Sequence, residues 1–122
     1  MSLDLKKLIR SFVYAKNGLV YVFKNEQNFR LQLIIGCLVI FAMLILHVEI
    51  WQAIVLILLI ILVLVLELIN TIFEKIVDIL KPRIHFYVEI IKDIMAAAVL
   101  LASIGAILIA ALIFVPHLLA LF

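Results

Sequence analysis

Three apolar runs without a charged residue dominate this chain, at residues 31–46, 53–66 and 94–122. About 20 predominantly apolar residues let a helix cross the hydrocarbon core of a bilayer, and each run lies in a stretch of that length. Hydrophobic residues make up 70% of the chain, whereas soluble domains hold about 45–50%. The sequence therefore predicts an all-α integral membrane protein, organised as a single domain over residues 1–122.

Residue spacing predicts four helices. Over residues 3–24, apolar side chains recur at helical spacing with cationic ones between them. This pattern is typical of an amphipathic helix that lies in the membrane interface, although such a helix could also pack on the protein itself. Three transmembrane helices are expected at about residues 27–47, 50–80 and 85–119.

The second spanning segment is longer than one bilayer crossing requires, so its last two turns should emerge into the interface. Pro82 is expected to end it, because proline lacks a backbone N–H and clashes with the preceding turn. Pro116 is expected to end or kink the third spanning helix. The single cysteine, Cys37, is interpreted as a small buried hydrophobe.

Charge distribution predicts the orientation. Lysine and arginine crowd the first 30 residues and recur between the second and third spanning segments, whereas the 47–51 turn has neither. The positive-inside rule then places the N-terminus and the 79–86 loop in the cytoplasm. The basic N-terminal end suits an anionic lipid surface, and no arginine-rich face with interleaved aromatic residues indicates a nucleic-acid partner.

A polar stripe ends the second spanning segment. On a helix that turns about 100° per residue, Glu67, Asn70, Glu74 and Asp78 share one face. A charged group at membrane depth costs on the order of 2.5–3.5 kcal/mol. Catalysis or ion binding is the leading reason to keep carboxylates there. The alternative for Glu67 is an interfacial carboxylate paired with Lys75 or Lys92.

Glu26, Lys92 and Asp93 are expected at the same cytoplasmic depth. Carboxylates without a cysteine or histidine cluster suit a hard cation such as Mg²⁺. A lysine could neutralise a phosphate, and a further carboxylate could accept a proton from a hydroxyl. These parts together describe phosphoryl transfer. Because the chain has no P-loop and no protein-kinase motif set, its nucleotide site would be of another kind.

Several motifs together resemble the prokaryotic diacylglycerol kinase / undecaprenol kinase family, small lipid kinases of the bacterial cytoplasmic membrane. The resemblance covers nearly the whole chain, and the C-terminal Phe-Val-Pro-His-Leu-Leu is similar to the Gram-positive, undecaprenol-preferring branch. It implies an ATP- and Mg²⁺-dependent kinase of a lipid alcohol, undecaprenol or diacylglycerol, that forms a homotrimer with active sites shared between subunits. The matching elements are the stretch from Glu67 to Asp78, Asn25-Glu26 with Phe29-Arg30, Lys92-Asp93 before an alanine-rich turn, Tyr14 and Gly18-Leu19.

The resemblance also implies roles for individual residues. Glu67 would be the general base acting on the lipid hydroxyl, Asn70 would orient the reacting groups, and Lys92 would contact phosphate. Glu26 and Glu74 would hold the divalent ion that bridges the ATP phosphates. The remaining residues implied at the nucleotide are Lys7 or Arg10, Tyr14, Arg83, His85 and Asp93.

Two positions depart from the family pattern. Glu89 replaces a usual lysine and Ala97 a usual glycine, which leaves nucleotide geometry and substrate choice open. These departures are the basis for an alternative, an inactive relative that acts as a structural or assembly partner. An ion or proton pathway is disfavoured, because residues 36–46, 53–66 and 107–115 supply no polar residues to continue it across the bilayer.

Overall fold

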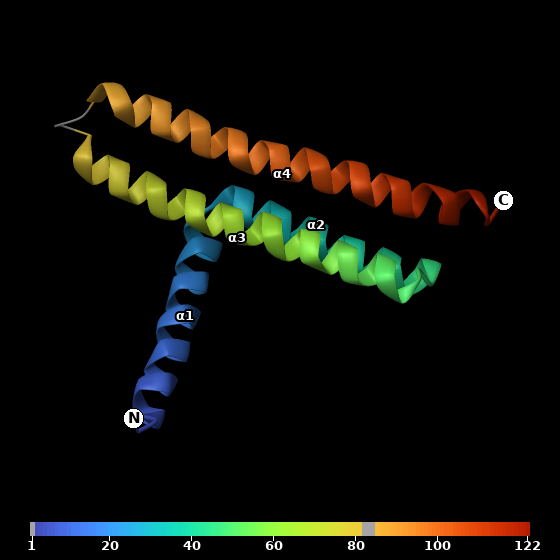
Figure 1. Cartoon of the computed structure of the whole chain (residues 1–122), viewed down its shortest axis with the longest axis horizontal. Helices are drawn as coiled ribbons and strands as arrows, with labels where there is room; N and C mark the ends of the chain where they lie inside the picture. The colour runs from blue at the N-terminus through green and yellow to red at the C-terminus, as the bar shows by residue number, and fades with distance from the viewer. Residues whose placement is uncertain (1, 82–84) are drawn as a thin grey trace.

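The computed structural model describes residues 2–81 and 85–122. The chain is all-α, as predicted. In Figure 1, α2, α3 and α4 run side by side with alternating direction, whereas α1 points away from this bundle. Within the described ranges, three helices are long and apolar enough to cross a membrane. The four helices are α1 (Leu5–Asn25), α2 (Gln27–Leu46), α3 (Ile50–Leu80) and α4 (His85–Leu119).

Helix α1 begins after Asp4, whose carboxylate accepts hydrogen bonds from the backbone N–H groups of Lys6 at 3.0 Å and Lys7 at 3.3 Å. These are donors that a helix start leaves without intrahelical partners. Large apolar side chains along α1, such as Leu8 and Phe12, are exposed in this chain. Whether α1 lies in the membrane interface stays a prediction.

A sharp corner joins α1 to α2. Glu26 is extended there, with φ −113° and ψ 110°, and caps both helices. Arg30, in the first turn of α2, donates from Nη1 to the carbonyl oxygens of Phe23 at 2.7 Å and Lys24 at 3.0 Å. The last carbonyls of a helix have no intrahelical partners, so this guanidinium closes the end of α1 and fixes where it leaves α2.

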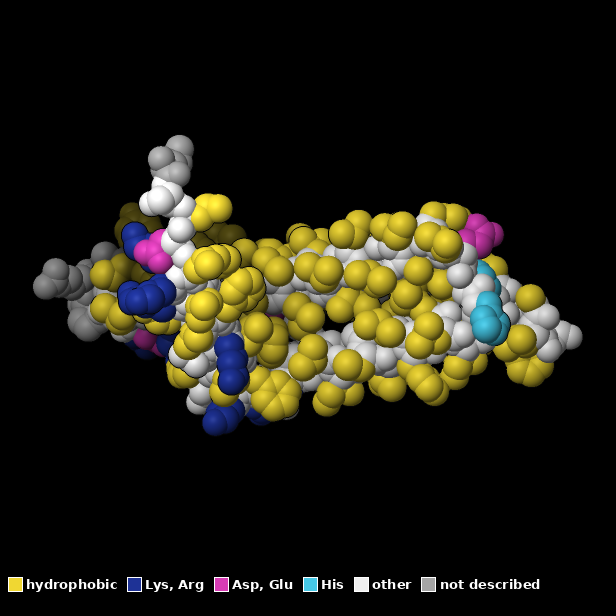
Figure 2. Space-filling model, turned by 90° about the horizontal axis from the view of Figure 1, so that it is seen from below, with side chains coloured by type: hydrophobic (Ala, Val, Ile, Leu, Met, Phe, Trp, Pro, Cys, Tyr) yellow, Lys and Arg dark blue, Asp and Glu magenta, His cyan; other side chains and the backbone are white. Residues whose placement is uncertain are grey.

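The turn between α2 and α3 lies at the opposite end of the bundle. His47 takes a left-handed conformation, with φ 51°, that ends α2. Glu49 and Gln52 form a reciprocal capping box that starts α3. The Trp51 indole N–H donates to the Glu49 carboxylate. Figure 2 shows cationic side chains gathered around α1 and hydrophobic side chains covering the length between the two ends.

Helix α3 is the central element, packing along α4 and α2. Its buried Leu56 packs with Met43 of α2 and Ile113 of α4, and these three residues form the core cluster near the α2–α3 turn. Gly36 permits a close approach of α2 to α3, because a Cβ atom there would lie 3.0 Å from Cγ2 of Ile60. The core is small, and most large apolar side chains point outward, as expected in a lipid solvent.

Two expectations require correction. Cys37 is exposed rather than buried, because α2 turns it outward, where an apolar lipid environment also suits a thiol. Pro116 does not end α4, which continues through it to Leu119, and a kink at this residue stays a prediction. Helix α3 does end at Leu80, whereas Pro82 itself lies outside the described residues.

Candidate active site

Glu67 is buried on α3 and only 2% exposed, the one buried carboxylate among the described residues. Gln32 of α2 donates from Nε2 to Oε2 of Glu67 at 3.3 Å. The Thr71 hydroxyl donates to the Glu67 backbone carbonyl at 3.0 Å. A buried carboxylate held by a neutral amide, without an ion-pair partner, is costly to keep and calls for a chemical reason.

The two predicted metal ligands lie near this carboxylate. Both Glu26 and Glu74 are close enough for their negative charges to act on Glu67. Glu26 comes from the α1–α2 corner, and Glu74 follows Glu67 by about two turns of α3. Asn70, on the turn between them, donates from Nδ2 to Oε1 of Glu74 at 3.3 Å. The fold therefore brings Glu26 and Glu74 within electrostatic range of Glu67, and these three carboxylates, Glu26, Glu67 and Glu74, are called the acidic cluster here.

The donor chemistry of this cluster fits Mg²⁺. Among the described residues, no group of three or more histidine, cysteine, aspartate or glutamate side chains could hold a metal ion by itself. Mg²⁺ does not require such a cage, because it is commonly held by one or two carboxylates together with waters and substrate phosphates. Glu26 and Glu74 match that requirement in type and number.

Lys92 lies at the same end of the bundle, on α4. Its Nζ atom is 2.9 Å from Oδ1 of Asp78, near the end of α3, and this pair joins the two helices. Asp78, the last member of the polar stripe, is thus the partner of the lysine expected to contact phosphate. Asp93 is exposed beside it.

Neither lysine considered as a partner for Glu67 is bonded to it in the described part of the chain. Lys92 is paired with Asp78, and the Lys75 ammonium lies over the Tyr21 ring, 5.6 Å from its centroid. This cation–π contact ties the end of α3 to α1. The structure therefore does not support the alternative in which Glu67 is an interfacial carboxylate paired with a lysine.

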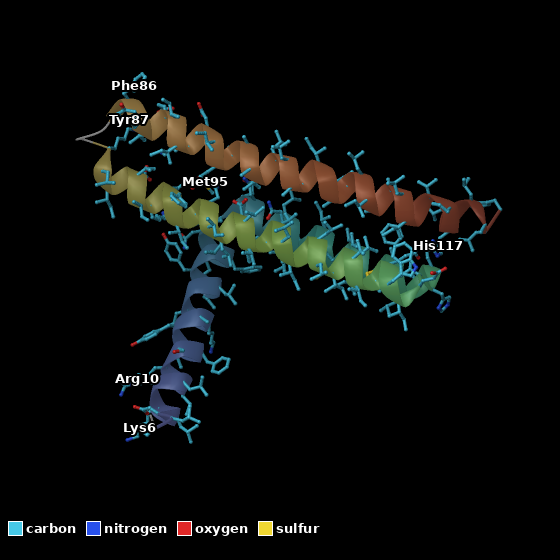
Figure 3. All side chains as sticks on the ribbon, in the orientation of Figure 1. Lys6, Arg10, Phe86, Tyr87, Met95 and His117 are labelled. Atoms are coloured by element: carbon cyan, nitrogen blue, oxygen red, sulfur yellow. The ribbon has the colours of Figure 1, made fainter. Side chains whose placement is uncertain are left out.

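Several residues implied at the nucleotide do not join the acidic cluster within one chain. Lys7, Arg10 and Tyr14 are exposed on α1, and Figure 3 shows Arg10 near the free end of that helix, away from the bundle. Arg83 and the side chain of His85 lie outside the described residues. The nucleotide role of these five residues stays a prediction.

Sequence reasoning missed two residues that shape the site. Gln32 is the one strongly polar residue in the apolar run 31–46, and that isolation was the available signal of its role. Arg30, which matched the family motif, gave no sign that it would close α1 and thereby set the position of Glu26.

Comparisons with known proteins identify the family to which this chain belongs. The family model for prokaryotic diacylglycerol kinase matches residues 13–114. A diacylglycerol kinase of Synechocystis sp. is 41% identical over 115 residues, which cover 93% of this chain and 66% of the relative, just under two thirds of its length. An undecaprenol kinase of Bacillus subtilis is 30% identical over 115 residues, 94% of each chain. This chain therefore belongs to the prokaryotic diacylglycerol kinase family, a family of lipid kinases.

Proposed function

We propose that this protein is an ATP- and Mg²⁺-dependent kinase that phosphorylates the hydroxyl group of a membrane lipid alcohol, either undecaprenol or diacylglycerol. The observation that carries the proposal is the buried Glu67 carboxylate, held by a neutral amide beside two further carboxylates. Family membership supports the same chemistry. Neither comparison favours the alternative of an inactive relative.

In the proposed reaction, the lipid hydroxyl oxygen attacks the γ-phosphorus of ATP and its proton passes to Glu67. The bond from the γ-phosphorus to the oxygen shared with the β-phosphorus breaks, and ADP leaves with that oxygen. Glu67 then releases the proton to water. The hydrogen bond from Gln32 leaves the other carboxylate oxygen free to accept the proton, because Gln32 occupies only Oε2.

Glu26 and Glu74 would hold Mg²⁺, which supplies charge neutralisation for the phosphates when bound. The Asn70 amide donates to Glu74 and so limits how far that carboxylate can turn away from the ion. Lys92 would contact a phosphate while its remaining ammonium protons keep the bond to Asp78, since an ammonium has three donors.

The reaction would take place at the cytoplasmic face of the bacterial cytoplasmic membrane. The gathering of lysine and arginine around α1, visible in Figure 2, supports a cytoplasmic N-terminus. The exposed apolar side chains of α1, including Phe12, support its placement in the interface. Glu26 and the Glu74 end of α3 would then face the compartment that contains ATP.

We infer a homotrimer in which neighbouring subunits complete each site. Lys7, Arg10 and Tyr14 lie away from the acidic cluster of their own chain, so they would reach the nucleotide of an adjacent subunit. Helix α4 carries small residues that permit close helix–helix approach. These residues are Ala96, Ala97, Ala98, Ala102, Ser103, Gly105 and Ala106.

The test is phosphorylation of undecaprenol and dioleoylglycerol by the purified chain in lipid nanodiscs, with Mg²⁺ and ATP labelled at the γ-phosphate. Label should enter at least one lipid, and Glu67→Gln should abolish its transfer. Glu49→Gln is the matched control, because it removes a carboxylate from the opposite end of the bundle. Absence of labelling by the wild type would overturn the proposal, and wild-type turnover by Glu67→Gln would overturn the assignment of the base.

A further inference from the structure

Helix α1 leaves the bundle and is held on it at few places. Figure 1 shows it pointing away from the other three helices. It packs mainly against α2, and Val22 is its one buried residue among those described. A groove of about 670 Å³ with mostly apolar lining lies between α1 and α3. Contacts across this groove therefore decide how α1 is oriented relative to α3.

Tyr21 and Lys75 meet across this groove. The Lys75 ammonium of α3 lies over the Tyr21 ring of α1, 5.6 Å from its centroid, and both residues line the groove. A cation over the face of an aromatic ring is attracted to it, and the attraction increases where water is excluded. This contact therefore restrains α1 at a distance from the residues that join it to α2.

The turn of α1 that carries Tyr21 leads directly to Glu26. The Asn25 side chain donates from Nδ2 to the Tyr21 carbonyl oxygen at 2.8 Å, which ties this turn to the last residue of α1. Glu26 follows and is the one residue between α1 and α2. A change in the angle between two helices is absorbed by the backbone torsions of the few residues that join them. A swing of α1 would therefore turn the backbone at Glu26 and redirect its carboxylate.

On α3, the same contact is made next to the other carboxylate of the proposed metal site. Lys75 directly follows Glu74 in the chain, and Glu26 is near enough for its negative charge to act on the Lys75 ammonium. Because Glu26 and Glu74 belong to different elements, their relative placement depends on links between those elements. The Tyr21–Lys75 contact is such a link.

We propose that Tyr21 and Lys75 are positioning residues, which hold α1 against α3 and thereby direct the Glu26 carboxylate toward the ion that it shares with Glu74. The inference rests on the proposed function, in which these two carboxylates hold Mg²⁺. Mg²⁺ demands near-ideal octahedral geometry, so a misdirected carboxylate weakens its binding. Loss of the contact should therefore raise the Mg²⁺ requirement, whereas turnover at saturating Mg²⁺ should be retained.

The test is a Mg²⁺ titration of the intact chain in lipid nanodiscs, at saturating ATP and lipid alcohol. Tyr21→Leu should raise the free Mg²⁺ concentration for half-maximal activity by about two- to fivefold, the range that a cation–π contact supplies. Lys75→Gln should cause a shift of similar size. Tyr21→Phe keeps the aromatic face and Lys75→Arg keeps a cation that stacks on it, so both should retain the wild-type requirement.

Two variants control for the loss of a ring and of a charge. Phe12→Leu removes an exposed ring from α1, more than two turns from Tyr21. Lys81→Gln removes a positive charge just beyond the end of α3. Both should retain the wild-type Mg²⁺ requirement. Tyr21→Leu combined with Lys75→Gln should behave like either single variant, because the two residues act as one contact.

A second measurement requires no kinase activity. Spin labels at Lys16→Cys on α1 and Ile79→Cys on α3, both exposed positions, report the distance between the two helices in a Cys37→Ala background. Labelled chains are diluted with unlabelled ones, so that the distance is measured within one subunit. Tyr21→Leu should broaden the distance distribution, whereas Phe12→Leu should leave it unchanged.

Three results would overturn the proposal. They are an unchanged distance distribution in Tyr21→Leu, additive shifts in the double variant, and a loss of kcat and thermal stability with an unchanged Mg²⁺ requirement. The last result would show that the contact only stabilises the fold. Wild-type protein that labels neither lipid alcohol would instead refute the proposed function, and the spin-label distances would still decide whether Tyr21 and Lys75 hold α1 against α3.

Discussion

The Lys92 ammonium lies 2.9 Å from the Asp78 carboxylate and joins the start of α4 to the end of α3. Their side chains are 35% and 54% exposed, respectively. An ion pair this accessible to water contributes little to stability. The ion pair instead fixes the position of Lys92, the lysine that we propose contacts the ATP phosphates.

Asp78→Asn should therefore raise the KM for ATP by about tenfold, because a lysine without its partner samples more positions. The thermal unfolding midpoint in detergent should not change. Lys92→Gln should raise the KM for ATP further, and adding Asp78→Asn to it should have little additional effect, because coupled residues are non-additive. Fully additive effects of the two substitutions on kcat/KM would contradict a positioning role for Asp78.

Arg30→Gln should increase the Mg²⁺ concentration required for half-maximal activity. The substitution removes both hydrogen bonds that close α1, so Glu26, at the corner between the helices, is less well placed to hold the ion. Arg30→Lys should restore the Mg²⁺ requirement in part, because a single nitrogen, Nη1, makes both hydrogen bonds and an ammonium also carries three donors. Mg²⁺ titration at saturating ATP and lipid measures the effect.

The control for Arg30 is Lys24→Gln, which removes one positive charge from the same corner but leaves the Arg30 hydrogen bonds in place. It should keep the wild-type Mg²⁺ dependence. If both variants shift the Mg²⁺ requirement equally, the effect is one of net charge and the positioning role of Arg30 is wrong.

Gln32→Leu should lower kcat by about tenfold or more, because it removes the donor that holds the Glu67 carboxylate in a buried site. The KM for ATP should stay close to that of the wild type. Thr71→Val is the matched control: it removes the hydrogen bond to the backbone carbonyl of Glu67 and leaves the carboxylate untouched. Steady-state kinetics of both variants in nanodiscs measure the effect. An unchanged kcat in Gln32→Leu would show that Gln32 does not orient the Glu67 carboxylate for catalysis.

The sequence allowed much of the secondary structure to be predicted. The helix ends lie within two residues of the expected positions, because apolar length, charge and proline act locally along the chain. The all-α class and the family are confirmed as well. The burial prediction for Cys37 was wrong, because in a membrane protein an apolar environment does not imply the protein interior.

Contacts between helices could not be predicted in the same way. The pairs Gln32–Glu67 and Asp78–Lys92 each join side chains on different helices. They depend on how each helix is rotated and how far it slides along its neighbour, which hydrophobic periodicity hardly constrains when a helix is apolar on all faces. Arg30 is similar, since its partners are carbonyls that become available only because α1 ends where it does.

Gly36→Ala should destabilise the protein by about 1 kcal/mol or more, as overpacking of a close contact does. Its new Cβ atom would lie 3.0 Å from Cγ2 of Ile60, so α2 and α3 would have to separate slightly or Ile60 would have to move. Gly105→Ala is the matched control on α4, because a Cβ there meets nothing within 4 Å in this chain.

The control should stabilise its helix by about 0.4–1 kcal/mol, since alanine restricts the unfolded chain more than glycine does. Unfolding midpoints in one detergent, measured for both variants and the wild type, should therefore move in opposite directions. Equal shifts would contradict the close α2–α3 contact. Destabilisation by Gly105→Ala would place another helix against this face of α4, as the proposed homotrimer allows, because within one chain that face has room for the added methyl group.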